Sequence, residues 1–273
     1  MSRVHMKRRL IAAGVVLAVL FTPFWIISAS ASKKLRSARI SSGVRSLLLS
    51  ERAAERVEEQ NRAVARLLKT TPVVRELPAA GREVALTFDD GPSGYSEEIL
   101  DTLIGHRVPA TFFPIGLAIE EHPETIRREA RDGFAIGDHT VHHPRMSDLS
   151  PADQEAEVLG QAADLRRSGA PAPNLFRPPF GVYDEATLKL LRRQGMLTVL
   201  WTVETDDYEL PGPEAIEQRV LEAVHPGAIV LMHDGGGDRS ETVAALPGIV
   251  QTLRDRGYEL VTVPQLVLDA SAG

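Results

Sequence analysis

The sequence predicts an α/β protein: a distorted (β/α) barrel of parallel strands, preceded by an N-terminal membrane or signal segment and a helical stalk. Three observations predict it. Beyond residue 82, short apolar runs alternate with amphipathic stretches, as in parallel β/α units. These units end near residue 265, which is short of a typical eightfold barrel, so the barrel should be incomplete or distorted. At the other end, an uncharged apolar run follows a basic N-terminus.

The apolar run extends from Leu10 to Ile27 and has the length that a helix needs to cross a hydrocarbon core. A secretory signal core is usually shorter, but Ala29-Ser30-Ala31 has the small-residue pattern of a cleavage site. We therefore expect an extracytoplasmic protein. It should be anchored in the membrane through residues 10–27, or secreted if it is cleaved near Ala31.

Charge and cysteine content exclude several classes of function. Residues 1–39 carry eight basic side chains and no acidic one, so the rest of the chain is more acidic than the whole-chain net charge of −6. An acidic body repels a phosphate backbone, and we expect no nucleic-acid partner. The chain has no cysteine, which excludes a disulfide framework, a thiolate metal site and a cysteine nucleophile. No protein partner is predicted.

Between the apolar run and the α/β body, apolar residues recur at helical spacing from Ile40 to Leu68, and no proline interrupts them. Charged residues break the apolar stripe, which favours a solvated spacer helix over a dimeric coiled coil. Two prolines and a glycine then indicate a linker. The expected segments are a signal anchor or signal peptide, a stalk, a linker, a catalytic domain and a tail, over residues 1–31, 32–69, 70–81, 82–265 and 266–273.

The body contains six strand candidates and six helix candidates. Polar motifs at the carboxyl ends of parallel strands meet at one rim, where β/α folds build active sites. The predicted strands are Val84–Phe88, Ala110–Ile115, Phe134–Ile136, Leu197–Val203, Ala228–Met232 and Tyr258–Val263. The predicted helices are Glu97–Ile104, Pro123–Arg131, Pro151–Arg167, Glu185–Arg193, Glu214–Val224 and Glu241–Arg256.

Two adjacent carboxylates, Asp89 and Asp90, follow the first strand, and Gly91-Pro92 ends it. Neighbouring strand residues point to opposite faces, so both carboxylates reach one site only if the strand ends there. A cation or a shared proton would relieve the repulsion between them. Taken alone, this tetrapeptide is more often a turn.

Three of the eight histidines lie in the segment from His139 to His143. The i, i+4 spacing of these two residues places them one helical turn apart on one face, which suits a single metal ion. His139 and His142 form a competing i, i+3 pair, and a surface histidine cluster is an equally good interpretation. Two histidines and one carboxylate leave coordination positions open, as in catalytic metal sites.

Three further motifs follow predicted strand positions. In Arg177-Pro-Pro-Phe-Gly181 the arginine can orient a carboxylate, although a structural loop is the alternative. His233 ends a strand, and an acid at another strand end, such as Asp207, can tune it as a general acid. A histidine held by a backbone contact is the alternative. The coincidence of all five motifs at strand ends indicates an active site.

The ordered motifs resemble the polysaccharide deacetylase family, the chitooligosaccharide-deacetylase-like carbohydrate esterases with a NodB homology domain. The resemblance implies a distorted (β/α) barrel of about seven parallel strands that usually holds zinc. The motifs are Thr87-Phe88-Asp89-Asp90, His139-Thr140-x-x-His143, Arg177-Pro-Pro-Phe-Gly, Asp207-Tyr208 and Leu231-x-His233.

The resemblance also implies a role for each matched residue. One divalent metal ion, most often zinc, would be bound by Asp90, His139 and His143. The catalytic set would be Asp89 as general base held by Arg177, and His233 as general acid paired with Asp207. The substrate would contact the backbone N–H beside Phe180, together with Tyr208 and Leu231. Phe180 replaces the usual tyrosine and Tyr208 the usual tryptophan, which leaves the sugar preference open.

The expected function is removal of N-acetyl groups from an amino-sugar polysaccharide by a metal-dependent hydrolase. The membrane tether favours cell-wall peptidoglycan over a chitin-like oligomer. One alternative is an O-acetyl polysaccharide esterase, because the same metal site could also catalyse ester hydrolysis. Another is an amidohydrolase of small cyclic amides, although the export segment counts against it. The last alternative is a catalytically silent membrane-tethered glycan-binding module. The complete set of site residues argues against it.

Overall fold

The structure is a computed structural model that describes residues 51–78 and 81–271. The chain divides into two compact units, 1–57 and 58–273. Of the first unit, residues 51–57 are described and are helical. The predicted membrane segment, Leu10–Ile27, lies outside the described residues. In the parts that are described, no helix is both long and apolar enough to span a membrane.

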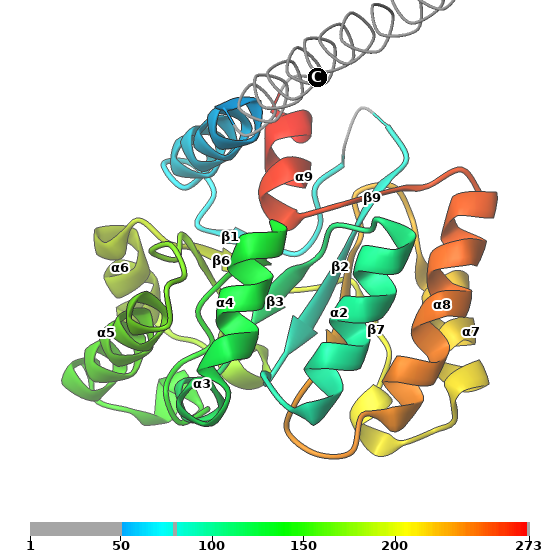
Figure 1. The fold of residues 1–273 in the computed structure, drawn as a ribbon. Helices are drawn as coiled ribbons and strands as arrows, with labels where there is room; N and C mark the ends of the chain where they lie inside the picture. The colour runs from blue at the N-terminus through cyan, green and yellow to red at the C-terminus, as the bar shows by residue number, and fades with distance from the viewer. Residues whose placement is uncertain (1–50, 79–80, 272–273) are drawn as a thin grey trace, which may run out of the picture. The chain divides into compact units, whose positions relative to one another are not determined.

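The second unit is an α/β fold with parallel sheets (Figure 1), which confirms the predicted class. Its helices alternate with strands along the chain. The strands are β1 Val73–Val74, β2 Glu83–Asp89, β3 Thr111–Phe113, β4 Ala135–Ile136, β5 Leu175–Phe176, β6 Leu197–Val199, β7 Val203–Glu204, β8 Ile229–His233 and β9 Glu259–Val261. The helices are α2 Gly94–His106, α3 Gly116–Glu121, α4 Pro123–Asp132, α5 Pro151–Arg167, α6 Glu185–Gln194, α7 Pro213–Ala223, α8 Ser240–Asp255 and α9 Val263–Ala270. Three short 3-10 turns are η1 Met146–Asp148, η2 Pro179–Gly181 and η3 Asp207–Glu209.

The strands of the second unit form two sheets. One has the order β4-β3-β2-β8-β7, with β9 also paired to β2, and the other has the order β1-β6-β5. All strand pairs are parallel, and an isolated parallel bridge between Asp138 and Phe176 links the β4 end of one sheet to β5 of the other. The described residues thus hold nine short strands in two sheets, where the resemblance implied about seven in one barrel.

The strand predicted over residues 197–203 is interrupted, and its two ends are β6 and β7. A buried side chain contacts the backbone at this break. The carbonyl of Val199 accepts a hydrogen bond from Nε of Arg177 at 3.2 Å, and the carbonyl of Leu200 accepts one from Nη2 at 3.4 Å. These carbonyls therefore bind a buried guanidinium where a continuous strand would pair with a neighbouring strand.

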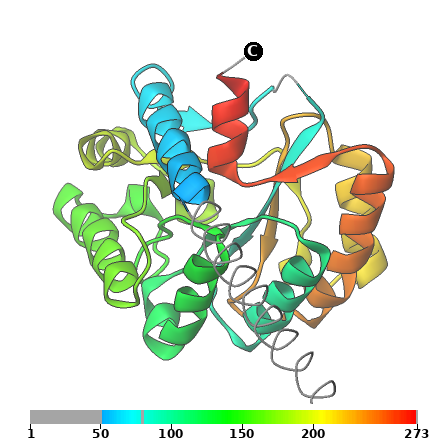
Figure 2. The same ribbon diagram turned by 45° about the horizontal axis from the view of Figure 1, so that its top comes forward.

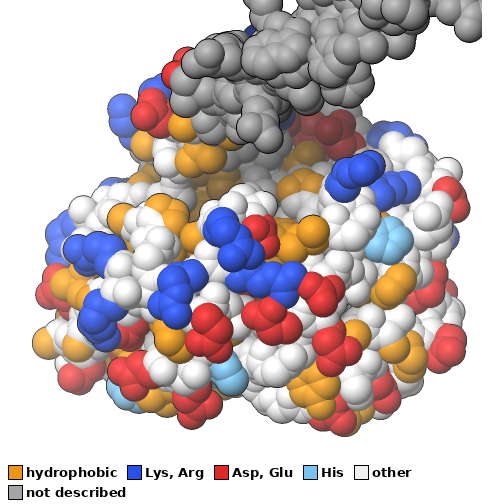
Figure 3. Space-filling model, in the orientation of Figure 1, with side chains coloured by type: hydrophobic (Ala, Val, Ile, Leu, Met, Phe, Trp, Pro, Cys, Tyr) orange, Lys and Arg blue, Asp and Glu red, His pale blue; other side chains and the backbone are white. Residues whose placement is uncertain are grey.

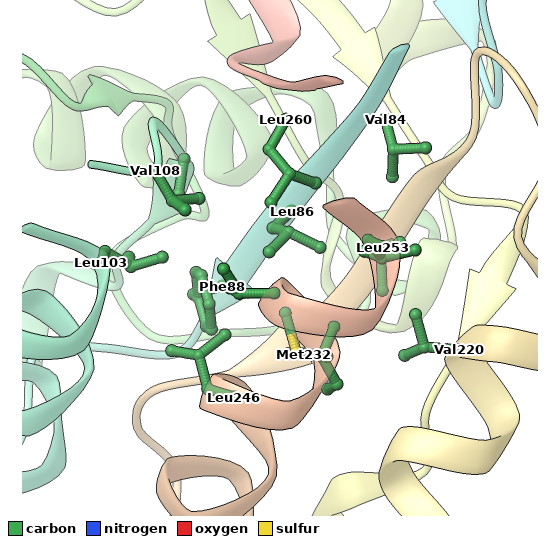
Figure 4. Close-up of a cluster of buried hydrophobic side chains, with 14 of the residues drawn as sticks. Val84, Leu86, Phe88, Leu103, Val108, Val220, Met232, Leu246, Leu253 and Leu260 are labelled. Atoms are coloured by element: carbon green, nitrogen blue, oxygen red, sulfur yellow. The ribbon is translucent and has the colours of Figure 1, made fainter. Parts of the chain in front are cut away.

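The largest hydrophobic cluster packs β2 and β8 against α2, α7 and α8 (Figure 4). Val84, Leu86 and Phe88 alternate along β2 and point into this cluster, where the Phe88 and Phe112 rings stack at 5.2 Å. Ala85, on the opposite face of β2, belongs to a second cluster. Because both faces of β2 are buried, Val84, Ala85 and Leu86 form a continuous apolar run, as is usual in a parallel sheet.

Both ends of the second unit pack onto the fold, and here the structure differs from the expected segment boundaries. The helical residues 58–67 bury Ala63 and Val64 in the second cluster, beside Leu266 and Val267 of α9. Figures 1 and 2 show this helix end (blue) next to α9 (red). The predicted linker 70–81 contains β1, and the predicted tail 266–273 contains most of α9. Burial of apolar side chains makes these segments part of the domain.

The face shown in Figure 3 carries basic and acidic side chains side by side. Arg128 of α4, for example, forms ion pairs with Glu97 and Asp101 of α2. Exposed pairs of this kind contribute little to stability, typically about 0–1 kcal/mol. The predicted site residues lie instead at the carboxyl ends of the strands.

Candidate active site

The polar motifs meet at one edge because of the strand register. Asp89 and His233 are register partners at the ends of β2 and β8. Asp207 begins η3 just beyond β7, which pairs with β8, and Arg177 directly follows β5. His139 follows the bridge that joins β4 to β5. The carboxyl ends of adjacent parallel strands thus bring together residues that are far apart in the sequence.

A candidate metal centre is formed by Asp90, His139 and His143, each of which offers one ligand atom within 4.8 Å of the others. Asp90 Oδ1 lies 3.4 Å from Nε2 of His139 and 3.3 Å from Nε2 of His143. Asp90 has a left-handed backbone, with φ of 70°, directly after the last residue of β2. This turn ends the strand and brings the Asp90 carboxylate next to the site that Asp89 also reaches.

The histidine segment is not helical, and the premise behind the i, i+4 interpretation is wrong. Residues 139–145 form an irregular loop in which Thr140 and His143 have positive φ values of 71° and 58°. Hydrogen bonds fold it: the Asp138 carboxylate accepts the Thr140 N–H, and Thr140 Oγ1 accepts the His143 N–H. The two rings still converge, with centroids 4.9 Å apart.

His142 lies away from this centre. Its Nδ1 is 2.8 Å from Oε1 of Glu157, and its side chain is 61% exposed. The other oxygen of Glu157 accepts the N–H groups of Val141 and His142 at 2.9 Å, which holds the loop against α5. Of the two histidine pairs, the structure therefore brings His139 and His143 together beside Asp90 and places His142 beside Glu157.

The donor set fits a divalent cation. Asp90 Oδ1 is buried and has no hydrogen-bond partner, so a buried carboxylate oxygen is left for a ligand. His139 Nδ1 lies 2.6 Å from the Arg177 carbonyl oxygen. A proton on Nδ1 that donates to this carbonyl leaves the lone pair of Nε2 facing Asp90, as in ligating histidines. Two histidines and one carboxylate form a common open site for zinc.

The charge states of these ligands support the same conclusion. Burial alone would raise the pKa of Asp90, but its close contact with His139 and the charges of His139, His143 and His233 lower that pKa to about 2. Burial and the charge of His139 lower the pKa of His143 below its usual value. At neutral pH the carboxylate is ionised and this imidazole is neutral, which are the forms that bind metals.

Asp89 is held by a buried arginine. Arg177 is completely buried, and its Nη1 donates to Asp89 Oδ1 at 2.7 Å and to Thr87 Oγ1 at 2.8 Å. Its guanidinium also lies 4.2 Å from the centroid of the Phe113 ring. Burial lowers the pKa of Arg177, and the charge of Asp89 opposes this effect. The other oxygen of Asp89 is 3.8 Å from Nε2 of His139, beside the metal ligands.

His233 and Asp207 form a second buried pair. His233 Nδ1 lies 2.7 Å from Asp207 Oδ1, while the His233 backbone N–H and Thr242 Oγ1 both donate to Oδ2 at 2.8 Å. Burial opposes the charged imidazole, but the hydrogen bond and charge of Asp207 raise the pKa of His233 above its usual value. The Nδ1 contact leaves Nε2 as the ring nitrogen that can exchange a proton with a substrate.

The three predicted substrate contacts differ in exposure. Phe180 is 57% exposed, has a positive φ of 60°, and its ring lies 4.6 Å from the His143 ring. The hydrogen bonds that hold this turn use the N–H groups of Gly181 and Val182, so they do not occupy the Phe180 N–H. Tyr208 is 47% exposed with its ring 5.6 Å from His233, whereas Leu231 is buried on β8.

Sequence reasoning assigned no role to three supporting residues, of which Thr87 was named only as part of a motif. Thr87 could have been found, because it lies two positions before Asp89 on β2 and therefore on the same face. Thr242 gave no signal, since it lies on α8 and meets Asp207 only in the fold. Asp234 is buried beside Ser96 of α2, which donates to its carboxylate, and burial raises the pKa of Asp234 to about 7.

The fold and the site together define a class: a parallel α/β protein with a candidate single-metal centre flanked by one carboxylate and one histidine. Residues 76–199 match the family model described as polysaccharide deacetylase. The chain belongs to the polysaccharide deacetylase family.

Curated relatives and solved structures agree with this membership. A chitooligosaccharide deacetylase from Bradyrhizobium is 40% identical over 198 residues, covering 68% of this chain and 90% of that one. A peptidoglycan-N-acetylglucosamine deacetylase from Bacillus cereus is 38% identical, with 71% and 92% covered. A solved peptidoglycan N-acetylglucosamine deacetylase has a TM-score of 0.70 and 33% identity, with 73% and 94% covered. A family pseudoenzyme from Bacillus anthracis has a TM-score of 0.69 and 28% identity, with 74% and 71% covered.

Proposed function

We propose that this protein is a metal-dependent hydrolase that removes N-acetyl groups from an amino-sugar polysaccharide. The observation that carries the proposal is the convergence of three groups at one edge of the fold. They are the Asp90, His139 and His143 cluster, the Asp89–Arg177 pair and the His233–Asp207 pair. Family membership and relatives named as chitooligosaccharide and peptidoglycan deacetylases support the substrate class.

Asp90, His139 and His143 would hold one divalent ion, and zinc suits this donor set. When bound there, the ion supplies Lewis-acid activation of an amide carbonyl and of water. Asp89, held in place by Arg177, takes the proton of the attacking water. The Phe180 N–H donates to the oxygen on which charge develops.

His233 completes the reaction as the general acid. The carbon–nitrogen bond of the N-acetyl group breaks when the nitrogen accepts a proton from His233 Nε2, which releases the sugar amine. Asp207 supports this role because its charge keeps the imidazolium stable at higher pH. Leu231, buried on β8 beside His233, supplies an apolar wall for the acetyl methyl group.

Membership in the family does not by itself imply catalysis, because one structural neighbour is described as a pseudoenzyme. The complete site favours an enzyme over a silent glycan-binding module. The test is acetate release by the purified full-length protein with added zinc. The substrates are N-acetylglucosamine oligomers, peptidoglycan and an O-acetylated polysaccharide. Release from the ester alone would favour the esterase, and no release with zinc bound would favour the silent module.

We further propose that the protein acts outside the cytoplasm and is tethered by residues 10–27. A polymer such as peptidoglycan lies outside the membrane, and residues 1–31 have the composition of a signal anchor or signal peptide. The intact mass of the native protein decides between the two forms. A mass that includes residues 1–31 supports the anchor, whereas a start at Ser32 would indicate a secreted protein.

A further inference from the structure

A cation lies beside the candidate metal centre and is not used by the chemistry proposed above. The Arg145 guanidinium is 5.2 Å from the centroid of the Phe180 ring, and that ring is 4.6 Å from the ring of His143. One exposed aromatic ring therefore separates the guanidinium from a candidate metal ligand. A group bound by Arg145 would belong to a part of the substrate next to the reacting one.

The position of Arg145 is well anchored although its side chain is exposed. It precedes η1, whose first residue, Met146, is completely buried. The Met146 carbonyl accepts a hydrogen bond from Nε2 of Gln154 on α5 at 2.9 Å. The backbone is thus fixed on both sides, because Pro144 restricts the chain before Arg145. Stacking on Phe180 then limits the directions that the guanidinium can take.

The charge of Arg145 is available for a ligand. In the described part of the chain, no carboxylate lies within ion-pair distance of its guanidinium, in contrast to Arg128 and Arg177. A guanidinium that stacks on an aromatic ring still presents its N–H groups at the edge of its plane. Two parallel N–H donors match the two oxygens of a carboxylate.

The opposite side of the site has the opposite charge. Glu204, Asp206 and Glu209 lie around Tyr208, and burial together with their charges raises the pKa of Tyr208. Arg219 pairs with Asp206 at 3.1 Å, so the acids still exceed the bases on this side. Tyr208 lies next to His233, whereas Phe180 lies next to His143. A polymer with an acidic substituent is therefore repelled on the Tyr208 side and attracted on the Phe180 side.

We propose that Arg145 is a specificity-determining residue that binds a carboxylate on the sugar beside the one being deacetylated. The inference rests on the proposed function and narrows its substrate class to amino-sugar polymers with acidic substituents. The carboxylate can be an ether-linked acid on the sugar itself or an acidic group of a peptide attached to that sugar. Both present the same chemistry to a guanidinium.

The test compares the wild-type protein with Arg145→Gln and with Arg192→Gln as a matched control. Arg192 is exposed in the last turn of α6, which leads into the start of β6, at the opposite edge of the sheet from the site. Each protein is assayed with four glycans. They are a neutral N-acetylglucosamine oligomer, peptidoglycan strands with their peptides, strands stripped of peptides, and stripped strands whose carboxylates have been amidated.

Arg145→Gln should lower kcat/KM on a carboxylate-bearing strand by about tenfold, mainly through KM, because one partly exposed charged contact is lost. Rates on the neutral oligomer and the amidated strand should change less than about twofold. Raising the salt concentration should reduce the wild-type advantage on the acidic strand. If kcat/KM of Arg145→Gln falls only on peptide-bearing strands, the carboxylate belongs to the peptide. If it also falls on stripped strands, the carboxylate belongs to the sugar.

An equal effect of Arg145→Gln on neutral and acidic strands would overturn the proposal. So would an equal effect of Arg145→Gln and Arg192→Gln on the acidic strands. Deacetylation of neutral oligomers by both variants shows that the fold and the proposed function are intact. If the wild-type protein releases no acetate from any of the four glycans, the proposed function itself fails, which is a different result.

Discussion

Asp89 and Asp90 are adjacent, but their surroundings differ enough that the two asparagine substitutions should fail in different ways. Asp89 is bound by the buried guanidinium of Arg177, and its side chain is 4% exposed. Asp90 Oδ1 faces the Nε2 atoms of His139 and His143 at 3.4 and 3.3 Å and has no hydrogen bond. In the proposed mechanism the first carboxylate moves a proton and the second holds a cation.

Asp89→Asn should fold and keep its metal. The amide oxygen can still accept from Arg177, which also donates to Thr87 and to the Val199 carbonyl. Removing one partner of a buried ion pair typically costs about 3–5 kcal/mol. Because these hydrogen bonds remain, we expect a loss of about 1–3 kcal/mol in the free energy of unfolding. Turnover should fall by about 10²–10⁴ because general-base catalysis is removed.

Asp90→Asn should instead weaken metal binding. With a pKa of about 2, Asp90 is ionised at neutral pH and is the one negatively charged member of the three-residue cluster. Loss of a group that only hydrogen-bonds to a metal ligand already weakens metal binding by about 10–100-fold, and loss of a direct charged ligand should exceed that. Activity should then depend on the metal concentration in this variant and much less in Asp89→Asn.

The two variants are compared side by side for bound metal, acetate release and melting temperature. Elemental analysis after gel filtration measures the metal, and a titration with zinc tests whether activity returns. Near-normal activity of Asp89→Asn at saturating zinc would refute the assignment of the base. Equal loss of metal in both variants would refute the division of roles between these carboxylates.

Asp207→Asn should move the alkaline limb of the pH–rate profile to lower pH, because the charge of this carboxylate raises the pKa of its histidine partner; an unmoved limb contradicts this. A histidine with a raised folded pKa stabilises the fold below its unfolded pKa, about 6.5, and this contribution disappears as the pH rises through the folded pKa. The melting-temperature difference between wild type and Asp207→Asn should therefore shrink at alkaline pH. His143→Ala should abolish zinc binding in calorimetry and His142→Ala should not; the reverse order would exclude the ligand assignment. Val64→Asp, at a fully buried position, should lower the melting temperature by at least about 5 °C, whereas Val57→Asp, at a position that is 52% exposed, should not. Equal melting temperatures would mean that the helix end does not stabilise the domain.

Several elements could be predicted because their signals are local. The bounds of α5 match the prediction, since Ser150 caps the helix and Pro151 starts it. β2 is the longest strand of the described residues, and its apolar residues from Val84 to Phe88 are buried on both faces. By contrast, β1 and β5 have two residues each and are defined by pairing with β6. Two residues carry no usable periodicity, so such strands become visible only once their partner is in place.

The site residues also divide into those that local signals predict and those that only the fold brings together. The order and types of its residues were readable in the sequence, since Asp89, Asp90 and His233 each stand at the end of an apolar run. The pairing of His139 with His143 was inferred from a helical spacing that the protein does not use. Their approach depends on two left-handed residues and on hydrogen bonds within the loop.

The sequence by itself determined the family, the parallel α/β class and the set of candidate site residues, because these depend on residue types in order along the chain. Only the tertiary structure decided which oxygen of Asp90 faces the histidines, that Thr242 supports Asp207, and that Arg145 stacks on Phe180. These contacts join elements that are distant in the sequence. The distances between these residues depend on how strands pair and helices pack, and a local sequence pattern does not predict either.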